Sequence, residues 1–508
     1  MNFKLLKKRK VGMILVILES ILSLGFIGML FALNVLSTSM VSIMAVFLIA
    51  VDAFLILTQM TKKTHKAGKV IATILGIIFA MGSFYLFKTY STLGKVSAQD
   101  YQIVSVSAIA MKKDSANTVK DALGYTFGII GVNDRENTDN TIKSIESEYS
   151  TTLKTKEYSD ATTLVDALYN GEVKAILFNE ANRSMVLEAH DDFDDATKVL
   201  GSIENKKKLE NDKAASDVTK EAFSVYISGI DTKGKVSATS RSDVNILGTV
   251  NPVTKQILLI STPRDYYVTL PNSNGVKDKL THAGIYGVDC SMGTLETLYD
   301  TDVNYYVRVN FTGFEKIVDA LGGVTVHSDY TFTSDWGPSF VKGDNKVNGK
   351  QALAFARQRH DYFRGKKTGL VGGDNQRGRD QQYLIKAIIN KATSPSILAN
   401  FSGLMDSVAE SVETNMKSSE ITDLVKMQLS DMSGWDIVMI NATGTGSKST
   451  TFSMPSTRSY VMVPDEASVS AAKKMVDKVI AGEKVTEDQF KELVKGTNSS
   501  TSSSTNNQ

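Results

Sequence analysis

Cysteine and histidine are scarce in this sequence, and their scarcity excludes two kinds of site. A single cysteine, Cys290, stands among 508 residues, so an intramolecular disulfide is impossible. Its surroundings, YGVDCSM, favour a small buried side chain over a reactive thiol. The five histidines, at positions 65, 190, 282, 327 and 360, lack the spacing of zinc ligands. Disulfide frameworks and histidine-based zinc centres are therefore not expected.

A dominant charge is also missing. The 57 basic and 55 acidic side chains leave a formal net charge of +2, which averages a basic N-terminus with a mixed remainder. Net charge therefore says almost nothing about partners, and local charge is the better guide. Length and apolar content are present instead: 508 residues, 42% of them hydrophobic, predict more than one domain and a substantial core.

Three long apolar runs open the chain, at 11–33, 40–57 and 70–87. Each approaches the roughly 20 residues that cross a bilayer, so residues 11–87 are predicted to form three transmembrane helices. Basic residues precede the first run and separate the second from the third. Because basic flanks stay in the cytoplasm, residues 1–10 are predicted to be cytoplasmic and the bulk of the chain extracellular. Its lack of disulfides suits a Gram-positive cell surface better than an oxidising periplasm.

Two carboxylates, Glu19 and Asp52, lie inside the first two of these runs. A carboxylate is costly there and usually faces a partner or a cavity. One hypothesis is a role in contacts with a lipid carrier or a biosynthetic partner. The other is that the two side chains only help the helices associate.

The rest of the chain divides into three parts by pattern. Residues 98–213 alternate strand and helix signals, which predicts a separate small α/β domain, and they contain no phosphate loop, metal cluster or nucleophile motif. Residues 491–508 are polar and of low complexity, so they are predicted to be disordered. Residues 222–490 remain as the largest domain.

Charged residues in this large domain gather at the ends of three predicted strands, 223–230, 244–250 and 256–262. The residues concerned are Asp231, Arg241, Asp243 and Arg264. Together they would suit a hard cation and a phosphate, since Asp oxygens hold Mg²⁺ and guanidinium groups bind phosphate oxygens in pairs. The alternative is that they are loop charges in surface ion pairs.

More basic residues follow downstream. Arg357 and Arg359 end one predicted helix, Arg377 and Gln381 share a face at the start of another, and Lys279 lies upstream. Polar groups at the N-terminal end of an apolar helix face point into a pocket, where the positive end of the helix favours an anion. The pattern therefore indicates an anion site.

A collinear series of motifs carries a family resemblance. In chain order they are SGID, SRSDVNIL, LLISTPRDYYV, DKLTHAGIYG, YYVRVNFTGFEKIVDALGGV, GKQALAFARQR and GGDNQRGRDQQ, covering about 222–395. On these motifs the chain resembles the LytR-CpsA-Psr family and, more narrowly, its members from streptococcal capsule loci. The resemblance implies a membrane-anchored α/β protein, with three N-terminal transmembrane helices, a small extracellular α/β domain and a larger catalytic α/β domain around a central mixed sheet.

The resemblance also implies an activity and its residues. Such proteins are phosphotransferases that move a glycan from a polyprenyl-pyrophosphate carrier to peptidoglycan and release polyprenyl monophosphate. By motif position, Asp231 and Asp243 are expected to hold Mg²⁺. The pyrophosphate is expected to bind Arg241, Arg264, Arg357, Arg359, Arg377 and Gln381, with Lys279 as a further positive charge. The implied partners are the lipid-linked glycan, peptidoglycan, the membrane and capsule assembly proteins.

The last motif leaves two questions open. Many family members have Arg-Gln where this chain has Asp380-Gln381, with Arg379 one place earlier, so one phosphate contact is in question. Asp374 is a candidate general base or ligand-orienting group, and an N-terminal cap for the following helix is the alternative. Arg241, Arg264 and Asp374 form the expected catalytic set, because phosphoryl transfer needs charge neutralised and oxygens aligned more than covalent help.

A long isoprenoid needs an apolar channel. Eight apolar side chains are candidates for its walls: Ile246, Leu258, Phe311, Phe314, Ile317, Leu384, Ile385 and Ile388. Each is equally a candidate for the hydrophobic core, and the sequence alone does not separate the two roles.

Two other classes of function compete with transfer. A membrane regulator would bind nucleic acid through its cytoplasmic N-terminus, but residues 1–10 are too short for a helix-turn-helix, so no nucleic-acid partner is expected. A non-catalytic module would bind the lipid-linked glycan and control capsule chain length or expression through partners. Hydrolysis of the pyrophosphate by water is a candidate side activity.

Overall fold

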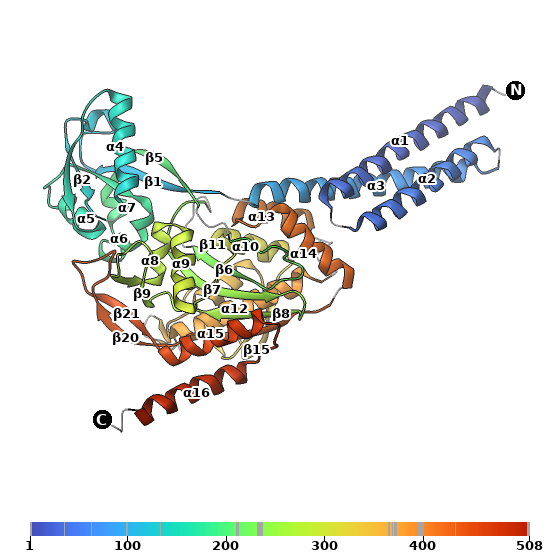
Figure 1. Cartoon of the computed structure of the whole chain (residues 1–508). Helices are drawn as coiled ribbons and strands as arrows, with labels where there is room; N and C mark the ends of the chain where they lie inside the picture. The colour runs from blue at the N-terminus through green and yellow to red at the C-terminus, as the bar shows by residue number, and fades with distance from the viewer. Residues whose placement is uncertain are drawn as a thin grey trace. The chain divides into compact units, whose positions relative to one another are not determined.

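The computed structural model has two compact units, coloured along the chain in Figure 1. One unit consists of Met1–Ser97, Thr393–Ala409 and Met416–Ser433, and the other of Ala98–Ala392, Glu410–Asn415 and Gly434–Gln508. The structure describes residues 3–34, 36–61, 63–97, 100–132, 134–209, 213–230, 237–363, 366–367, 369, 373–394, 401–431 and 433–504.

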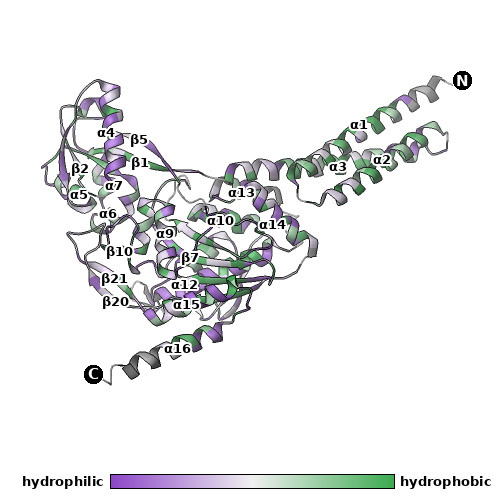
Figure 2. Cartoon of the chain, viewed as in Figure 1, coloured by the Kyte–Doolittle hydropathy of each residue, from purple (hydrophilic) through white to green (hydrophobic). Residues whose placement is uncertain are grey.

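The first unit begins with three long helices, α1 (Phe3–Leu33), α2 (Thr38–Met60) and α3 (His65–Val96). The stretches Lys10–Leu33, Thr38–Met60 and His65–Val96 are long and apolar enough to cross a membrane, with mean hydropathies of 2.4, 2.7 and 2.2. Many of their large apolar side chains are exposed, and Figure 2 shows apolar residues along all three helices. Such a surface suits lipid rather than water. The predicted membrane anchor is confirmed.

Two later helices, α13 (Phe401–Ser411) and α14 (Ser418–Asp431), lie mostly in this first unit. Polar residues beyond the apolar run of α3 hold them: Lys88 Nζ lies 2.5 Å from Asp406 Oδ1, and Thr92 Oγ1 donates to the Met405 carbonyl at 3.2 Å. The compact unit therefore departs from the predicted domain 222–490, which includes both helices. Within the unit Glu19 is buried and Asp52 half-buried, which leaves both hypotheses for these carboxylates open.

In the second unit, residues 101–208 form a mixed sheet with the strand order β3-β2-β4-β1-β5. Its strands are β1 (Tyr101–Met111), β2 (Thr126–Ile130), β3 (Lys154–Tyr158), β4 (Ala175–Asn179) and β5 (Thr197–Lys208). Helix α4 (Arg135–Tyr149) packs on one face through Ile145. The other face is covered by α5 (Ala161–Tyr169), α6 (Arg183–Ala189) and α7 (Phe193–Ala196). The predicted small α/β fold is confirmed.

The larger sheet of this unit has the order β18-β11-β6-β7-β8-β19. Its strands are β6 (Phe223–Ile230), β7 (Ser242–Asn251), β8 (Gln256–Ser261), β11 (Tyr305–Asn310), β18 (Val412–Thr414) and β19 (Asp436–Asn441). Strand β7 runs antiparallel to β6 and β8, whereas β8 is parallel to β19 and β6 to β11. The predicted central mixed sheet is confirmed, and the three predicted strands are its middle members.

Helices cover both faces of the large sheet (Figure 1). Apolar residues of α8 (Leu280–Ala283), α9 (Val288–Tyr299) and α15 (Glu466–Ile480) pack on one face, around Leu247, Leu258 and Ile260. On the other face, α12 (Gly373–Ala392) packs against Ile246, Leu259 and Met439. Because side chains alternate along a strand, neighbouring residues such as Leu258 and Leu259 enter different cores.

Short elements complete the second unit. The remaining helices are α10 (Phe311–Ala320), α11 (Gly349–Arg357) and α16 (Glu487–Ser504), with single turns at η1 (Lys120–Ala122), η2 (Glu180–Asn182) and η3 (Gly284–Tyr286). The small strand pairs are β9–β10 (Tyr267–Thr269, Lys277–Lys279), β12–β15 (Val324–Ser328, Gly343–Val347), β13–β14 (Phe332–Thr333, Ser339–Phe340), β16–β17 (Tyr362–Phe363, Lys366–Lys367) and β20–β21 (Gly444–Ser449, Ser459–Pro464).

Helix α16 corrects the prediction for the C-terminal tail. Residues 491–504 are helical, whereas the polar composition predicted disorder from 491 onward. The physical reason is that Phe490 and Leu493 pack against the core beneath α15, which anchors the start of the helix. Residues 505–508 lie outside the described part of the chain.

Cys290 lies in α9 and is buried, as predicted. Its Sγ atom donates to Asn272 Oδ1 at 3.4 Å. Burial raises the pKa of the Cys290 thiol to about 12. The side chain therefore contributes to packing and stays a thiol at neutral pH.

Candidate functional site

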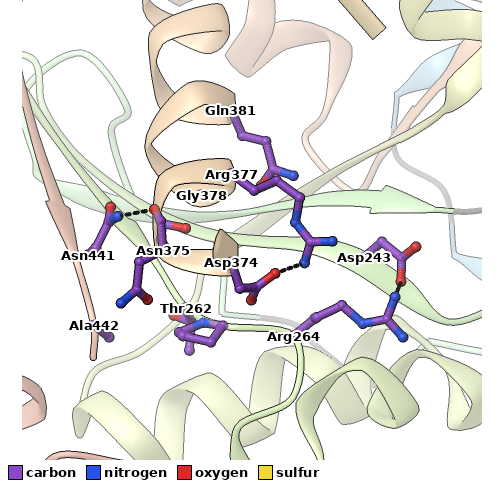
Figure 3. A pocket seen from close by; sticks show the side chains of 12 residues that line it. Asp243, Thr262, Arg264, Asp374, Asn375, Arg377, Gly378, Gln381, Asn441 and Ala442 are labelled. Atoms are coloured by element: carbon purple, nitrogen blue, oxygen red, sulfur yellow. Dashed lines mark hydrogen bonds and ion pairs between the residues drawn. The ribbon is translucent and has the colours of Figure 1, made fainter. Parts of the chain in front are cut away.

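A small pocket lies where strand ends of the large sheet meet the first turns of α12 (Figure 3). Strands β8 and β19 are parallel and end there, and the antiparallel β7 begins there. The lining residues are Asp243, Ser261, Thr262, Pro263, Arg264, Asp374, Asn375, Arg377, Gly378, Gln381, Asn441 and Ala442. The carboxyl ends of parallel strands next to a helix N-terminus form a common anion site.

Two largely buried ion pairs dominate this pocket. Arg264 Nη1 lies 2.8 Å from Asp243 Oδ1, and Arg377 contacts the carboxylate of Asp374 one turn earlier on α12. Figure 3 shows both guanidinium groups pointing into the same space. The pocket thus holds two arginines with their charges balanced by two carboxylates.

The surroundings act on the two guanidinium groups in opposite directions. Burial acts to lower the pKa of Arg264, but the carboxylates of Asp243 and Asp265 outweigh it, so that the pKa is raised. Burial lowers the pKa of Arg377, and the positive charges of Arg264 and Arg359 act the same way. A guanidinium stays charged in proteins, so burying the charge of Arg377 costs free energy. An additional anion in the pocket would reduce that cost.

Helix α12 approaches the sheet closely at the pocket. A Cβ atom at Gly378 would lie 2.4 Å from Ser261 Oγ, so this position favours glycine. Gln382 Nε2 donates to the carbonyls of Leu259 and Ile440, at 2.9 and 2.8 Å, and so ties the helix to β8 and β19. Asn441 Nδ2 donates to the Asn375 carbonyl at 2.7 Å. Gln382 and Asn441 position the pocket.

Sequence reasoning missed both of these residues. Gln382 belongs to the quoted motif GGDNQRGRDQQ. However, no sequence pattern identifies a glutamine whose buried amide donates hydrogen bonds to the carbonyls of two strands. Asn441 directly follows the apolar run DIVMI, so a rule that polar residues after parallel strands face a shared edge would have found it.

The structure brings together only part of the predicted anion site. Asp243, Arg264, Asp374, Arg377 and Gln381 line the pocket. The other predicted cations, which are outside its lining, are Arg241, Lys279, Arg357 and Arg359.

These outer cations have defined surroundings. Arg357 lies between two aromatic rings, with its guanidinium carbon 4.8 Å from the centre of the Phe311 ring and 4.5 Å from that of Trp336. Arg359 is exposed. Lys279 Nζ lies 3.5 Å from Asp265 Oδ1. Aromatic stacking holds a guanidinium in place while leaving its N–H edges available to an anion.

Arg241 is the most buried of the outer cations, with 5% of its side chain exposed. Its Nη1 atom lies 2.6 Å from Oε1 of Glu188, at the end of α6 in the small α/β domain. Its Nη2 donates to the Ser184 carbonyl at 3.4 Å. The predicted phosphate ligand is therefore held by the neighbouring domain.

Arg379 does not take the place of the arginine that the family resemblance leads one to expect at position 380. Asp380 is fully buried and accepts a hydrogen bond from Gln376 Nε2 at 2.9 Å; burial raises its pKa well above the ordinary value. Arg379 lies 3.3 Å from Asp329 and 3.4 Å from Glu487. Neither residue lines the pocket, so neither supplies the phosphate contact that the sequence put in question.

The eight predicted lipid-binding residues do not share one surface. Ile246 and Ile385 belong to the core beneath α12, whereas Leu258 lies in the core on the opposite face of the sheet. Leu258 lies on the opposite face because side chains alternate along a strand, and its role in binding lipid stays a prediction. Leu384 is also fully buried. The half-buried members are Phe311, Phe314, Ile317, Ile385 and Ile388.

The predicted metal site is described only in part. Asp231 lies outside the described residues. Among the residues that the structure describes, no three His, Cys, Asp or Glu side chains are grouped to hold a metal ion. Asp243 contributes a carboxylate, which a hard cation prefers, beside Thr281, whose Oγ1 lies 3.5 Å from its Oδ1. Ile230, the last residue of β6, pairs with Ser242 next to Asp243.

Comparisons with known proteins identify the family. Residues 188–478, more than half of the chain, match the model of the LytR_cpsA_psr family, and the chain belongs to this family. A polyisoprenyl-teichoic acid–peptidoglycan teichoic acid transferase, TagU of Bacillus subtilis (strain 168), is 36% identical over 224 residues, which cover 44% of this chain and 69% of the relative. The TagU of Bacillus mycoides (strain KBAB4) is 32% identical over 243 residues, 47% of this chain and 76% of the relative.

Solved structures include TagV of Bacillus subtilis, which is 27% identical, with a TM-score of 0.42 over 52% of this chain and 99% of that chain. The family match over residues 188–478 confirms the family resemblance drawn from the motifs. The narrower resemblance to members from streptococcal capsule loci stays a prediction.

Proposed function

We propose that this chain is a magnesium-dependent phosphotransferase that moves a capsular or other anionic glycan from a polyprenyl-pyrophosphate carrier to peptidoglycan. The observation that carries the proposal is the pair of buried guanidinium groups, Arg264 and Arg377, which face one pocket at the N-terminus of α12. Transferases of the same family, named for moving teichoic acid to peptidoglycan, support it.

The geometry suits binding of a diphosphate. Arg264 and Arg377 offer planar sets of donors that match phosphate oxygens, and the first turn of α12 adds backbone N–H groups. Arg357, stacked between its two rings, and the exposed Arg359 extend the positive surface beyond the pocket. Arg264 and Arg377 would therefore neutralise the charge on the reacting phosphates.

The reaction exchanges one phosphorus–oxygen bond for another. A hydroxyl oxygen of peptidoglycan attacks the phosphorus that carries the glycan, and the bond from that phosphorus to the bridging oxygen breaks. Polyprenyl monophosphate leaves with the bonding electrons, and the hydroxyl proton passes to a base, for which Asp374 is the candidate in the pocket. Hydrolysis, with water in place of the sugar hydroxyl, is the expected side activity.

Asp243, with Asp231, would hold Mg²⁺, whose chemistry is to neutralise phosphate oxygens. Asp243 is suited to this role because its carboxylate lies in the pocket beside Arg264. Arg264, which pairs with Asp243 in this structure, would turn its guanidinium to the phosphate. The half-buried Phe311, Phe314, Ile317 and Ile388 remain candidates for contacts with the isoprenoid.

The site is proposed to work on the outer face of the cell membrane. Basic residues precede α1, and further lysines separate α2 from α3, which by the positive-inside rule puts these segments in the cytoplasm. The second unit would then face the wall, where lipid-linked glycan and peptidoglycan meet. Capsule assembly proteins are proposed partners there.

The test uses the full chain in detergent with polyprenyl-pyrophosphate oligosaccharide, Mg²⁺ and peptidoglycan, and it measures release of lipid monophosphate and attachment of glycan. Arg377→Ala is expected to lose at least about a hundredfold in rate, the usual effect of removing one donor that stabilises developing charge. Arg379→Gln is the matched control, because Arg379 is on the same helix but outside the pocket.

Three outcomes separate the alternatives. Glycan attachment that Arg377→Ala loses and Arg379→Gln keeps supports the transferase. Release of lipid monophosphate without attachment, with every acceptor, would make the chain a pyrophosphatase. Binding of the lipid without turnover would make it the non-catalytic module that controls chain length or expression.

A further inference from the structure

Three arginines in or near the pocket are paired with carboxylates in this structure. The pairs are Arg264 with Asp243, Arg377 with Asp374, and Arg241 with Glu188. A diphosphate that binds one of these three arginines through its paired nitrogens must replace the carboxylate there. The three carboxylates differ in how easily they can be replaced.

Glu188 differs from the other two in origin and exposure. Asp243 and Asp374 belong to the large domain and expose 17% and 21% of their side chains, whereas Glu188 comes from α6 of the small domain and exposes 60%. An exposed carboxylate can turn into water at little cost, while buried Arg241 has no such freedom. Glu188 is therefore the partner that can leave.

Glu188 also lies in the field of the whole cationic cluster. Partial loss of solvent around the carboxylate acts to raise the pKa of Glu188, but the positive charges of Arg241, Arg264 and Lys279 outweigh it, so that the pKa is lowered. Its carboxylate is thus held in the charged form by the same cations that are proposed to bind the diphosphate. A carboxylate oxygen 2.6 Å from a guanidinium nitrogen has the geometry that a phosphate oxygen adopts on arginine.

One N–H donor of Arg241 is unused among the described residues. Its Nε atom is buried and makes no hydrogen bond with any residue that the structure describes. A buried unpaired donor carries a cost that an incoming anion relieves. The Ser184 carbonyl, which accepts from Nη2, would keep the guanidinium in place during the exchange.

We propose that Glu188 occupies the place of a phosphate oxygen on Arg241, and that the small α/β domain thereby sets the affinity of the anion site. An incoming pyrophosphate takes Arg241 from Glu188, and the released carboxylate turns to solvent. This role rests on the proposed function, because it requires the site to bind a diphosphate. It gives the small domain a residue in the site of the large one.

The test measures binding of inorganic pyrophosphate, with Mg²⁺, to the full chain in detergent by titration calorimetry. Glu188→Gln is expected to bind about fivefold more tightly than the wild type, the effect of removing one partly exposed competing ion pair. Glu172→Gln is the matched control, because Glu172 is an ion-paired glutamate of the same domain whose partner is Lys156. Its affinity is expected to stay unchanged.

The outcomes separate this role from the proposed function. Equal or weaker binding by Glu188→Gln, while Arg264→Ala still abolishes binding, would overturn the competing role and leave the proposed function standing. Weaker binding would specifically make Glu188 a residue that positions Arg241. If neither the wild type nor Glu188→Gln binds pyrophosphate, both the role and the proposed diphosphate site are overturned. Because Glu188 is largely exposed, its replacement leaves the fold intact.

Discussion

Gly284 offers a sharp test of how the Arg241 segment is built. A Cβ atom at this position would lie 2.4 Å from the Ser240 carbonyl oxygen and 3.1 Å from the Ser242 nitrogen. Both neighbours are backbone atoms, so no side-chain rotation can remove the contact. Gly284→Ala must instead displace the chain around Arg241, at the start of β7.

The magnitude follows from two opposing terms. Gly284 has a φ of −63°, which alanine adopts without strain, so the substitution alone would stabilise by up to about 1 kcal/mol through the unfolded state. Overpacking against backbone costs about 1–3 kcal/mol, and a contact of 2.4 Å belongs at the upper end. The expected net loss is about 2 kcal/mol, which lowers the Tm by about 4–8 °C.

The assay combines thermal unfolding with glycan transfer. A shift of under 1 Å at Arg241 is expected to lower the transfer rate at least about tenfold, since small misplacements of binding groups are costly. Gly124→Ala is the control, because a Cβ atom there meets nothing within 4 Å. Its Tm and rate are expected to match or exceed those of the wild type.

One result would refute this reasoning. If Gly284→Ala unfolds at the wild-type temperature and keeps its transfer rate, the close approach of η3 to the chain before β7 does not position Arg241. If Gly124→Ala lost as much Tm and transfer rate as Gly284→Ala, the cause would be a general effect of alanine and not the close contact at Gly284.

Two further predictions concern Arg357 and Asp380. Trp336→Ala removes one of the two rings that hold Arg357, so the KM for the lipid-linked glycan is expected to rise about two- to tenfold at unchanged Tm, and an unaltered KM in steady-state assays would contradict this. Asp380 has a raised pKa in the fold, so the stability it contributes is present below its unfolded pKa of about 3.9 and lost as pH rises towards the folded value. Asp380→Asn, which keeps the contact with Gln376, is therefore expected to raise the Tm at pH 7 but not at pH 4, and equal gains at both would refute the assignment.

Local patterns predicted the middle of the large sheet well. The runs around β6, β7 and β8 are apolar and are closed by Gly, Pro, Asn or Asp, and their order in the sheet follows their order in the chain. Strand ends that meet at one edge also brought Asp243 and Arg264 together, 2.8 Å apart. Strands that are consecutive in the chain are separated by few residues and usually lie side by side, so local sequence patterns are enough to predict their pairing.

Local sequence patterns did not predict contacts between residues far apart in the chain. Arg241 carries no sign in the sequence that its partner is Glu188, because the pair joins two domains and depends on how they pack. Gln382 bonds carbonyls on β8 and β19, which only the assembled sheet places side by side. By contrast, the alternation of Leu258 and Leu259 was present in the sequence and could have assigned them to opposite faces.

The buried Cys290 makes this chain a convenient carrier for site-specific labels. With its thiol 8% exposed and protonated at neutral pH, it reacts slowly with maleimides while the protein stays folded. A cysteine introduced on the exposed end of α6 would therefore take up a fluorophore or spin label without removal of the native residue. A second label on the large domain would then give the distance between the two domains with and without pyrophosphate.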